Sequence, residues 1–154
     1  MTNETKTPAE TAFANAELMA EPTTTSAADA RERAKVWLNT CAQAFYTAKD
    51  ELMSTSESCR RAEGAANSAK AKFESAQALA DKAAEVAASR DTEATRTSAR
   101  ETQAAADTAR AAFEDAERYH EECLERLRAA FQLPERIKPL WQRASYMFKS
   151  LGCN

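Results

Sequence analysis

Cys59, Cys123 and His120 are the residues of this chain whose types and positions come closest to a chemical site. In a chain folded back about Asp91, Cys59 would face Cys123, and His120 would lie one helical turn before Cys123. Two thiols and an imidazole are zinc ligands, and two facing thiols could form a disulfide. A third reading is plain packing, since free cysteine is a small residue that is readily buried. We favour packing, and predict no metal and no cofactor.

No established catalytic motif accompanies these residues. The chain has no nucleophile elbow, no phosphate-binding glycine loop and no HExxH zinc motif. Its carboxylates gather on faces that we expect to be solvated, where they support solubility and helix pairing; examples are Glu114, Asp115, Glu117, Glu121 and Glu122. The sequence therefore predicts that the protein is not an enzyme.

A seven-residue repeat of apolar and small residues runs along the chain twice and would position these side chains. The first run extends from Leu38 to Ala87 and the second from Ala99 to Leu151. In each heptad a second seam residue follows the first one three positions later. Sustained heptads are typical of coiled coils. The phase of the repeat breaks between the runs, where Asp91 is a good capping residue. We predict an all-α, elongated antiparallel coiled-coil hairpin; the alternative is a continuous helix in a parallel dimer.

This hairpin divides the chain into three parts. Residues 1–25 are expected to form a mostly flexible arm, residues 26–151 the hairpin with its turn near 89–93, and residues 152–154 a tail. Pro134 and Pro139 each remove a backbone donor, which predicts a kink or a break near 134–139. The fold-back register pairs large seam residues with small ones, for example Phe73 with Ala109.

Composition narrows the classes of function. Of 154 residues only two are glycine and four are proline, which is typical of long helices. A net charge of −3 gives no general attraction to nucleic acid. No apolar run is long enough to span a bilayer, and residues 1–20 lack the pattern of a secretory signal. We expect a cytoplasmic protein, either free or peripheral to membranes.

The C-terminal end of the hairpin has a wider apolar surface than its alanine-rich middle. Three readings remain open: the N-terminal segment around Phe13, Leu18 and Met19 covers this surface, or it binds a protein partner, or it contacts an anionic membrane as a basic amphipathic helix. The candidate binding residues are Trp37, Leu133, Leu140, Trp141, Arg143, Tyr146, Met147 and Lys149.

The run Ile137-Lys138-Pro139-Leu140-Trp141, followed by Tyr146, Met147 and Phe148, resembles the lysine–proline–aromatic motif of the Sab-type Src-homology-three-domain-binding family. The resemblance implies a coiled-coil hairpin that activates a Rab-type GTPase by promoting nucleotide exchange. An earlier copy of that motif is missing here, and the hairpin is shorter. The alternatives are a self-associating structural rod, viral or bacterial, and a membrane-surface module. Protein–protein interaction through the coiled coil is the leading prediction.

Overall fold

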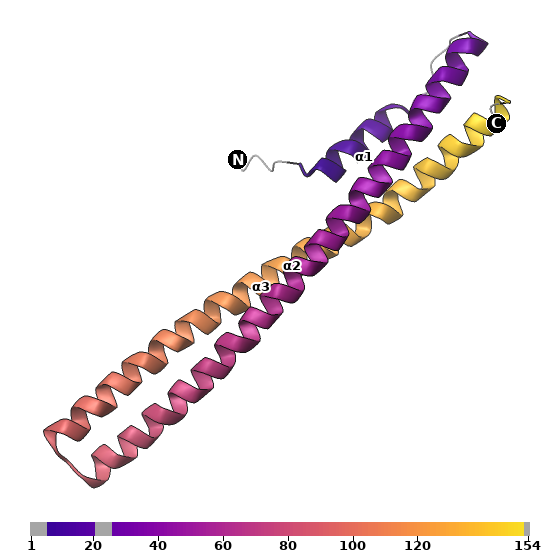
Figure 1. Ribbon diagram of the computed structural model, residues 1–154. Coiled ribbons are helices and arrows are strands. Elements are labelled where there is room, and N and C mark those ends of the chain that lie inside the picture. The colour runs from indigo at the N-terminus through magenta and orange to yellow at the C-terminus, as the bar shows by residue number, and fades with distance from the viewer. Residues whose placement is uncertain (1–5, 21–25, 153–154) are drawn as a thin grey trace. The chain divides into compact units, whose positions relative to one another are not determined.

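The computed structural model describes residues 6–20 and 26–152, and every regular element in these ranges is a helix (Figure 1). In chain order they are α1 (Pro8–Leu18), α2 (Ala27–Ser89) and α3 (Glu93–Ser150). Helices α2 and α3 pack against each other along their lengths as an antiparallel hairpin. The predicted all-α hairpin is confirmed, and the continuous helix of a parallel dimer is wrong. No described helix combines the length and the apolar character needed to cross a membrane.

The heptad seam is the contact surface between α2 and α3. Every seam position of both runs is buried or partly buried, from Leu38 to Ala87 and from Ala99 to Leu151. Ile137 and Ala144 are fully buried, and no charged or polar side chain is buried among the described residues. Because burial of apolar surface is the main favourable contribution to folding, this seam holds the two helices together.

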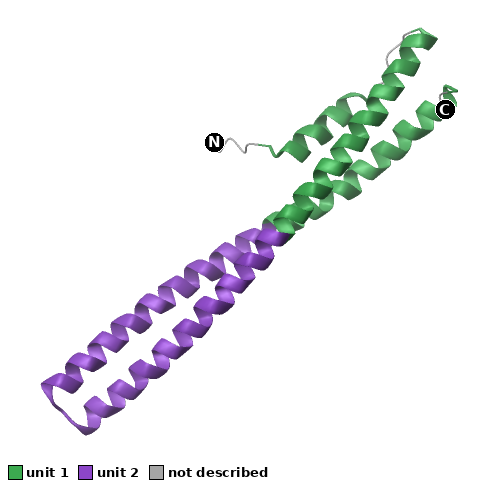
Figure 2. Ribbon diagram, in the orientation of Figure 1, with its two compact units in different colours: residues 1–56, 126–154 green, residues 57–125 purple. Residues whose placement is uncertain are grey.

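The chain divides into two compact units, shown in green and purple in Figure 2. Unit 2, residues 57–125, contains the hairpin turn and a narrow core of alanines and two cysteines, with two partly buried aromatic rings. The rings of Phe73 and Phe113 are stacked with their centroids 6.3 Å apart. Both rings are partly exposed, so they can overlap at the border of the seam, and the expected pairing of Phe73 with Ala109 stays a prediction.

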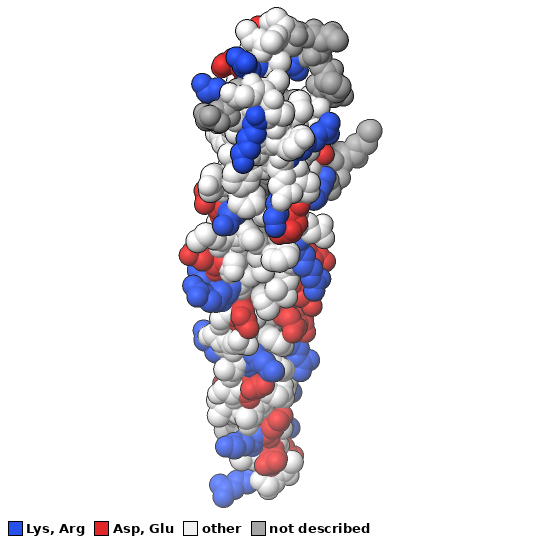
Figure 3. Space-filling view, turned by 90° about the vertical axis from the view of Figure 1, so that its right-hand side faces the viewer, with Lys and Arg blue, Asp and Glu red and all other residues white. Residues whose placement is uncertain are grey.

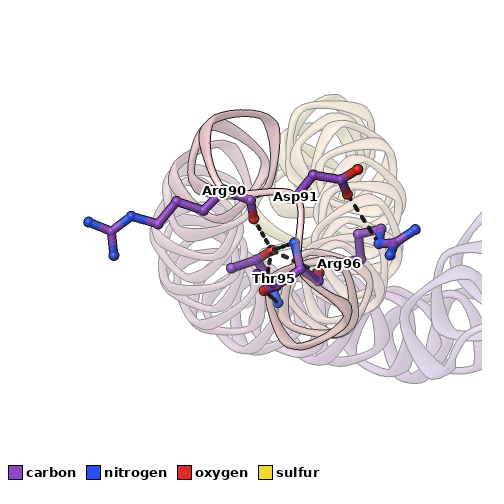
Figure 4. Close-up of polar contacts among 5 residues, drawn as sticks. Arg90, Asp91, Thr95 and Arg96 are labelled. Carbon is purple, nitrogen blue, oxygen red and sulfur yellow. Dashed lines mark hydrogen bonds and ion pairs between the residues drawn. The ribbon is translucent and has the colours of Figure 1, made fainter.

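The turn lies where the phase of the repeat breaks, since α2 ends at Ser89 and α3 begins at Glu93. Thr92 caps α3: its hydroxyl oxygen accepts from the Thr95 N–H at 3.3 Å, and the Thr95 hydroxyl oxygen accepts from the Thr92 N–H at 3.2 Å. The Thr95 hydroxyl also donates to the carbonyl of Arg90 (Figure 4). The exposed ion pair between Asp91 and Arg96, at 3.2 Å, adds little because solvent screens it.

Unit 1, residues 1–56 with 126–154, contains α1. Thr7 and Glu10 form a capping box at the start of this helix, and Pro8 occupies its first turn, where no N–H is needed. An isolated helix of this length would be marginal in water, so the packing of α1 against α2 and α3 must stabilise it. The flexible arm that we expected for residues 1–25 is therefore corrected for Pro8–Leu18; residues 1–5 and 21–25 lie outside the described part.

Helix α3 passes through Pro134 and Pro139 without a break. The predicted break near 134–139 is therefore wrong, and the kink stays a prediction. Each proline deprives the carbonyl four residues earlier of its helical donor, at a cost on the order of 3 kcal/mol. The packing of α3 in unit 1 must offset this cost, and Ile137, between the two prolines, is fully buried there. After Ser150 the chain turns at Gly152, whose φ of 72° is typical of a glycine that ends a helix.

Replacing the cap residue by Thr92→Ala should lower the free energy of unfolding by about 1 kcal/mol, because the Thr95 N–H loses its acceptor. Urea denaturation followed by circular dichroism measures the change. Thr108→Ala is the matched control, since Thr108 lies on an exposed turn inside α3 and only bonds back to the Ala104 carbonyl. Equal stability of the Thr92 variant and the control would contradict the capping role.

Candidate functional site

The seam between α2 and α3 has two sides in unit 1, and α1 covers one of them. Phe13 of α1 lies in a buried cluster with Ala44, Leu133 and Ile137. The guanidinium of Arg136 lies over the Phe13 ring, 4.5 Å from its centroid. An arginine over an aromatic face is attracted by the ring quadrupole and shields it from water.

Two polar contacts fix the position of α1. The indole Nε1–H of Trp37 donates to the Ala16 carbonyl at 3.0 Å in a buried position. The Ala9 N–H, one of the free donors in the first turn, donates to Glu51 Oε1 at 3.0 Å. The docking of α1 thus satisfies backbone groups at both of its ends, in addition to burying its apolar face.

The other side of the seam is an open groove with a volume of about 760 Å³. Helix geometry places this groove on the flank away from α1. Ala44 and Ala48 of α2 lie in the cluster with α1, whereas Phe45 and Lys49, each one residue later, point to a different side of α2 and line the groove. The residues that line this open groove are Phe45, Lys49, Leu52, Phe131, Pro134, Glu135, Lys138, Trp141, Gln142, Ser145, Tyr146 and Lys149.

Aromatic rings form much of the open groove. The ring centroids of Phe45 and Trp141 are 5.1 Å apart, and Tyr46 contacts both rings edge-on or nearly so. Phe131 and Tyr146 are 64% and 74% exposed, so each offers most of a large ring to solvent. Exposed aromatic residues around a concave apolar surface are typical of interaction sites.

The charges around the open groove are mostly positive. Lys49, Lys138 and Lys149 line it against the single carboxylate of Glu135. The ammonium of Lys49 lies 5.6 Å from the centroid of the Phe45 ring. On the face drawn in Figure 3, residues without a charged side chain cover much of unit 1, with lysine and arginine and a few acidic residues scattered among them. The local field therefore favours an anionic ligand although the chain as a whole is acidic.

The predicted binding residues divide between the two sides of the seam. Trp37 and Leu133 are 5% and 7% exposed and lie in the clusters that α1 packs on, so their expected role in a free binding surface is corrected. Leu140 is partly buried against the same clusters. Of the remaining candidates, Trp141, Tyr146 and Lys149 line the open groove, Arg143 lies over the Trp37 ring at 6.0 Å, and Met147 is 45% exposed.

The N-terminal segment covers part of this surface, as one of the three sequence-based readings proposed. Phe13 is buried, and Met19 packs against the cluster around Trp37, whereas Leu18 is 72% exposed. Sequence reasoning missed the α2 wall of the open groove, where Phe45, Lys49 and Leu52 recur at helical spacing. Their spacing was a usable signal, but it does not show which flank of the seam α1 would leave open.

Cys59 and Cys123 lie together in unit 2 as free, buried thiols, joined by a hydrogen bond. Burial, and then the neighbouring Cys123, raise the pKa of the Cys59 thiol, which keeps it in its unreactive neutral form. The described residues include no group of three His, Cys, Asp or Glu side chains arranged to hold a metal ion, so His120 does not complete a zinc site. Cys153 lies outside the described residues.

Cys41 is fully buried beside Trp37, and burial raises the pKa of its thiol from 9.0 to about 11. The folded state thus favours the neutral thiol, and this contribution to stability is complete below pH 9.0 and is lost as the pH rises toward about 11.

We expect Cys41→Ala to weaken the fall in unfolding free energy between pH 9.0 and about 11, because the variant has no thiol to ionise at this position. The measurement is the difference in unfolding free energy between wild type and variant, followed by urea denaturation across this pH range. Identical pH profiles would contradict the prediction.

No family model, curated protein or solved structure matches this chain. The fold and the groove define a helical-hairpin module with one covered and one open side in unit 1.

Proposed function

We propose that this protein binds another protein through the open groove of its helical hairpin. The observation that supports this most is the exposure of Phe131 and Tyr146, at 64% and 74%, beside the partly buried Trp141. Truncation of such large aromatic anchors commonly dominates the loss of affinity at protein interfaces. Binding requires no covalent chemistry, and no catalytic group is part of the proposal.

A Rab-type GTPase is the first partner to test, with the protein acting in the cytoplasm. The motif that resembles the Sab-type family includes Lys138 and Trp141, and both residues line the open groove. Nucleotide exchange by such a module would work through binding energy: the hairpin would bind the GTPase more tightly when the nucleotide pocket is open, and so increase the population of that state.

A photo-reactive amino acid in place of Tyr146 should cross-link to the partner in a cell extract, since this side chain points into solvent at the groove. The same amino acid in place of Tyr119 is the matched control, because Tyr119 is 51% exposed but belongs to unit 2. The purified partner should then bind the double variant Phe131→Ala, Tyr146→Ala at least about tenfold more weakly than wild type. Unchanged affinity of this variant would contradict the proposal.

If the Rab assignment is right, the protein should also accelerate nucleotide release from one member of a panel of purified Rab-type GTPases. The groove double variant should abolish the acceleration, and Tyr119→Ala should leave it intact. No acceleration across the panel would remove the Rab assignment and leave the broader proposal to the cross-linking result.

A further inference from the structure

We propose that the occupant of the open groove is an acidic amphipathic helix of another protein, packed on the seam as α1 packs on its opposite side. This inference rests on the proposed function and specifies the partner's chemistry.

Helix α1 shows what kind of segment the α2–α3 seam accepts. Its buried residues Ala9, Phe13 and Ala16 are spaced by four and three positions, so they form one stripe along a single helix face. From Pro8 to Leu18 it contains Glu10 and Glu17 but no lysine or arginine. The chain therefore already packs one acidic, amphipathic helix against this pair of helices.

The open groove offers a second place for such a helix. Pairs of antiparallel helices bury their apolar surface by packing further helices on both flanks, as helical bundles do. In unit 1 only one flank has its helix among the described residues. On the other flank, Phe131 and Tyr146 stand exposed beside Trp141, with a volume of about 760 Å³ between the walls. An amphipathic helix fills such a groove with anchors one and two turns apart.

The charges select an acidic helix over a basic one. Lys49, Lys138 and Lys149 line the groove, and the structure shows no ion pair for any of them among the described residues. Glutamates on the flanks of a docked helix would approach these ammonium groups, whereas lysines there would be repelled. Charge around an interface mainly controls partner choice and the rate of association, so the effect should depend on salt concentration.

The test uses two designed peptides of roughly 20 residues, long enough to become helical in water. Both have leucine and phenylalanine along one face; one has glutamate on the flanks and its twin has lysine there. Fluorescence anisotropy with the full chain should show binding of the acidic peptide, and at least about tenfold weaker binding of the basic twin. Phe131→Ala, Tyr146→Ala should abolish binding, and Tyr119→Ala should preserve it. Lys138→Glu, Lys149→Glu should reverse the preference between the peptides.

Any of four results would overturn the inference. Equal affinity for the two peptides, or no binding of either, would remove the acidic helix as occupant. Sedimentation with anionic vesicles that is lost in the Lys138→Glu, Lys149→Glu variant, without peptide binding, would assign the groove to a lipid surface. A concentration-dependent mass that is lost in the Phe131→Ala, Tyr146→Ala variant would assign it to a second copy of this chain. If both peptides fail while cross-linking at Tyr146 persists, the inference fails and the proposed function stands.

Discussion

The packing of α2 on α3 along the heptad seam is the interaction on which the other features of this protein depend. Small side chains such as Ala62 and Ala106 fill much of the seam, and cysteines, aliphatic residues and aromatic rings complete it. Neither helix could bury its apolar stripe alone, and helices in proteins gain most of their stability from such packing. The seam also creates the two flanking surfaces in unit 1, one of which receives α1 while the other forms the open groove.

The difference between these two surfaces gives the candidate site its character. On one flank α1 buries Phe13 and uses the indole N–H of Trp37, so that the apolar surface there is closed. On the other flank Tyr146 and Phe131 stay exposed, and lysines surround them. Exposed apolar surface costs free energy in water, and its concentration at one groove is consistent with a surface that becomes buried on binding.

The hairpin could be predicted from the sequence because its signal is periodic. Each heptad repeats the same information, and the phase break locates the turn at Asp91. The pairing of Cys59 with Cys123 follows from that centre alone. Aromatic overlap was not predictable in the same way: Phe73 meets Phe113 because long side chains at the border of the seam reach beyond their own layer.

Periodicity does not predict that α1 docks on the hairpin, so the sequence does not show which residues of the site stay accessible. Phe13 was a visible candidate, but a helix as short as Pro8–Leu18 forms only with tertiary support, which propensity does not encode. The flank that α1 covers decides which residues remain accessible. Trp37 and Leu133 were therefore assigned to a binding surface that α1 in fact closes, while Phe45 and Lys49 were missed.

The two tryptophans lie on different flanks of the seam and can show that one flank is closed and the other open. Trp37 is 5% exposed on the covered flank, and Trp141 is partly exposed in the open groove. Iodide quenching of fluorescence in the single-tryptophan variants Trp141→Phe and Trp37→Phe reports on each in turn. We expect strong quenching of Trp141, aided by the nearby lysines, and weak quenching of Trp37. Equal quenching of the two indoles, or stronger quenching of Trp37, would contradict it.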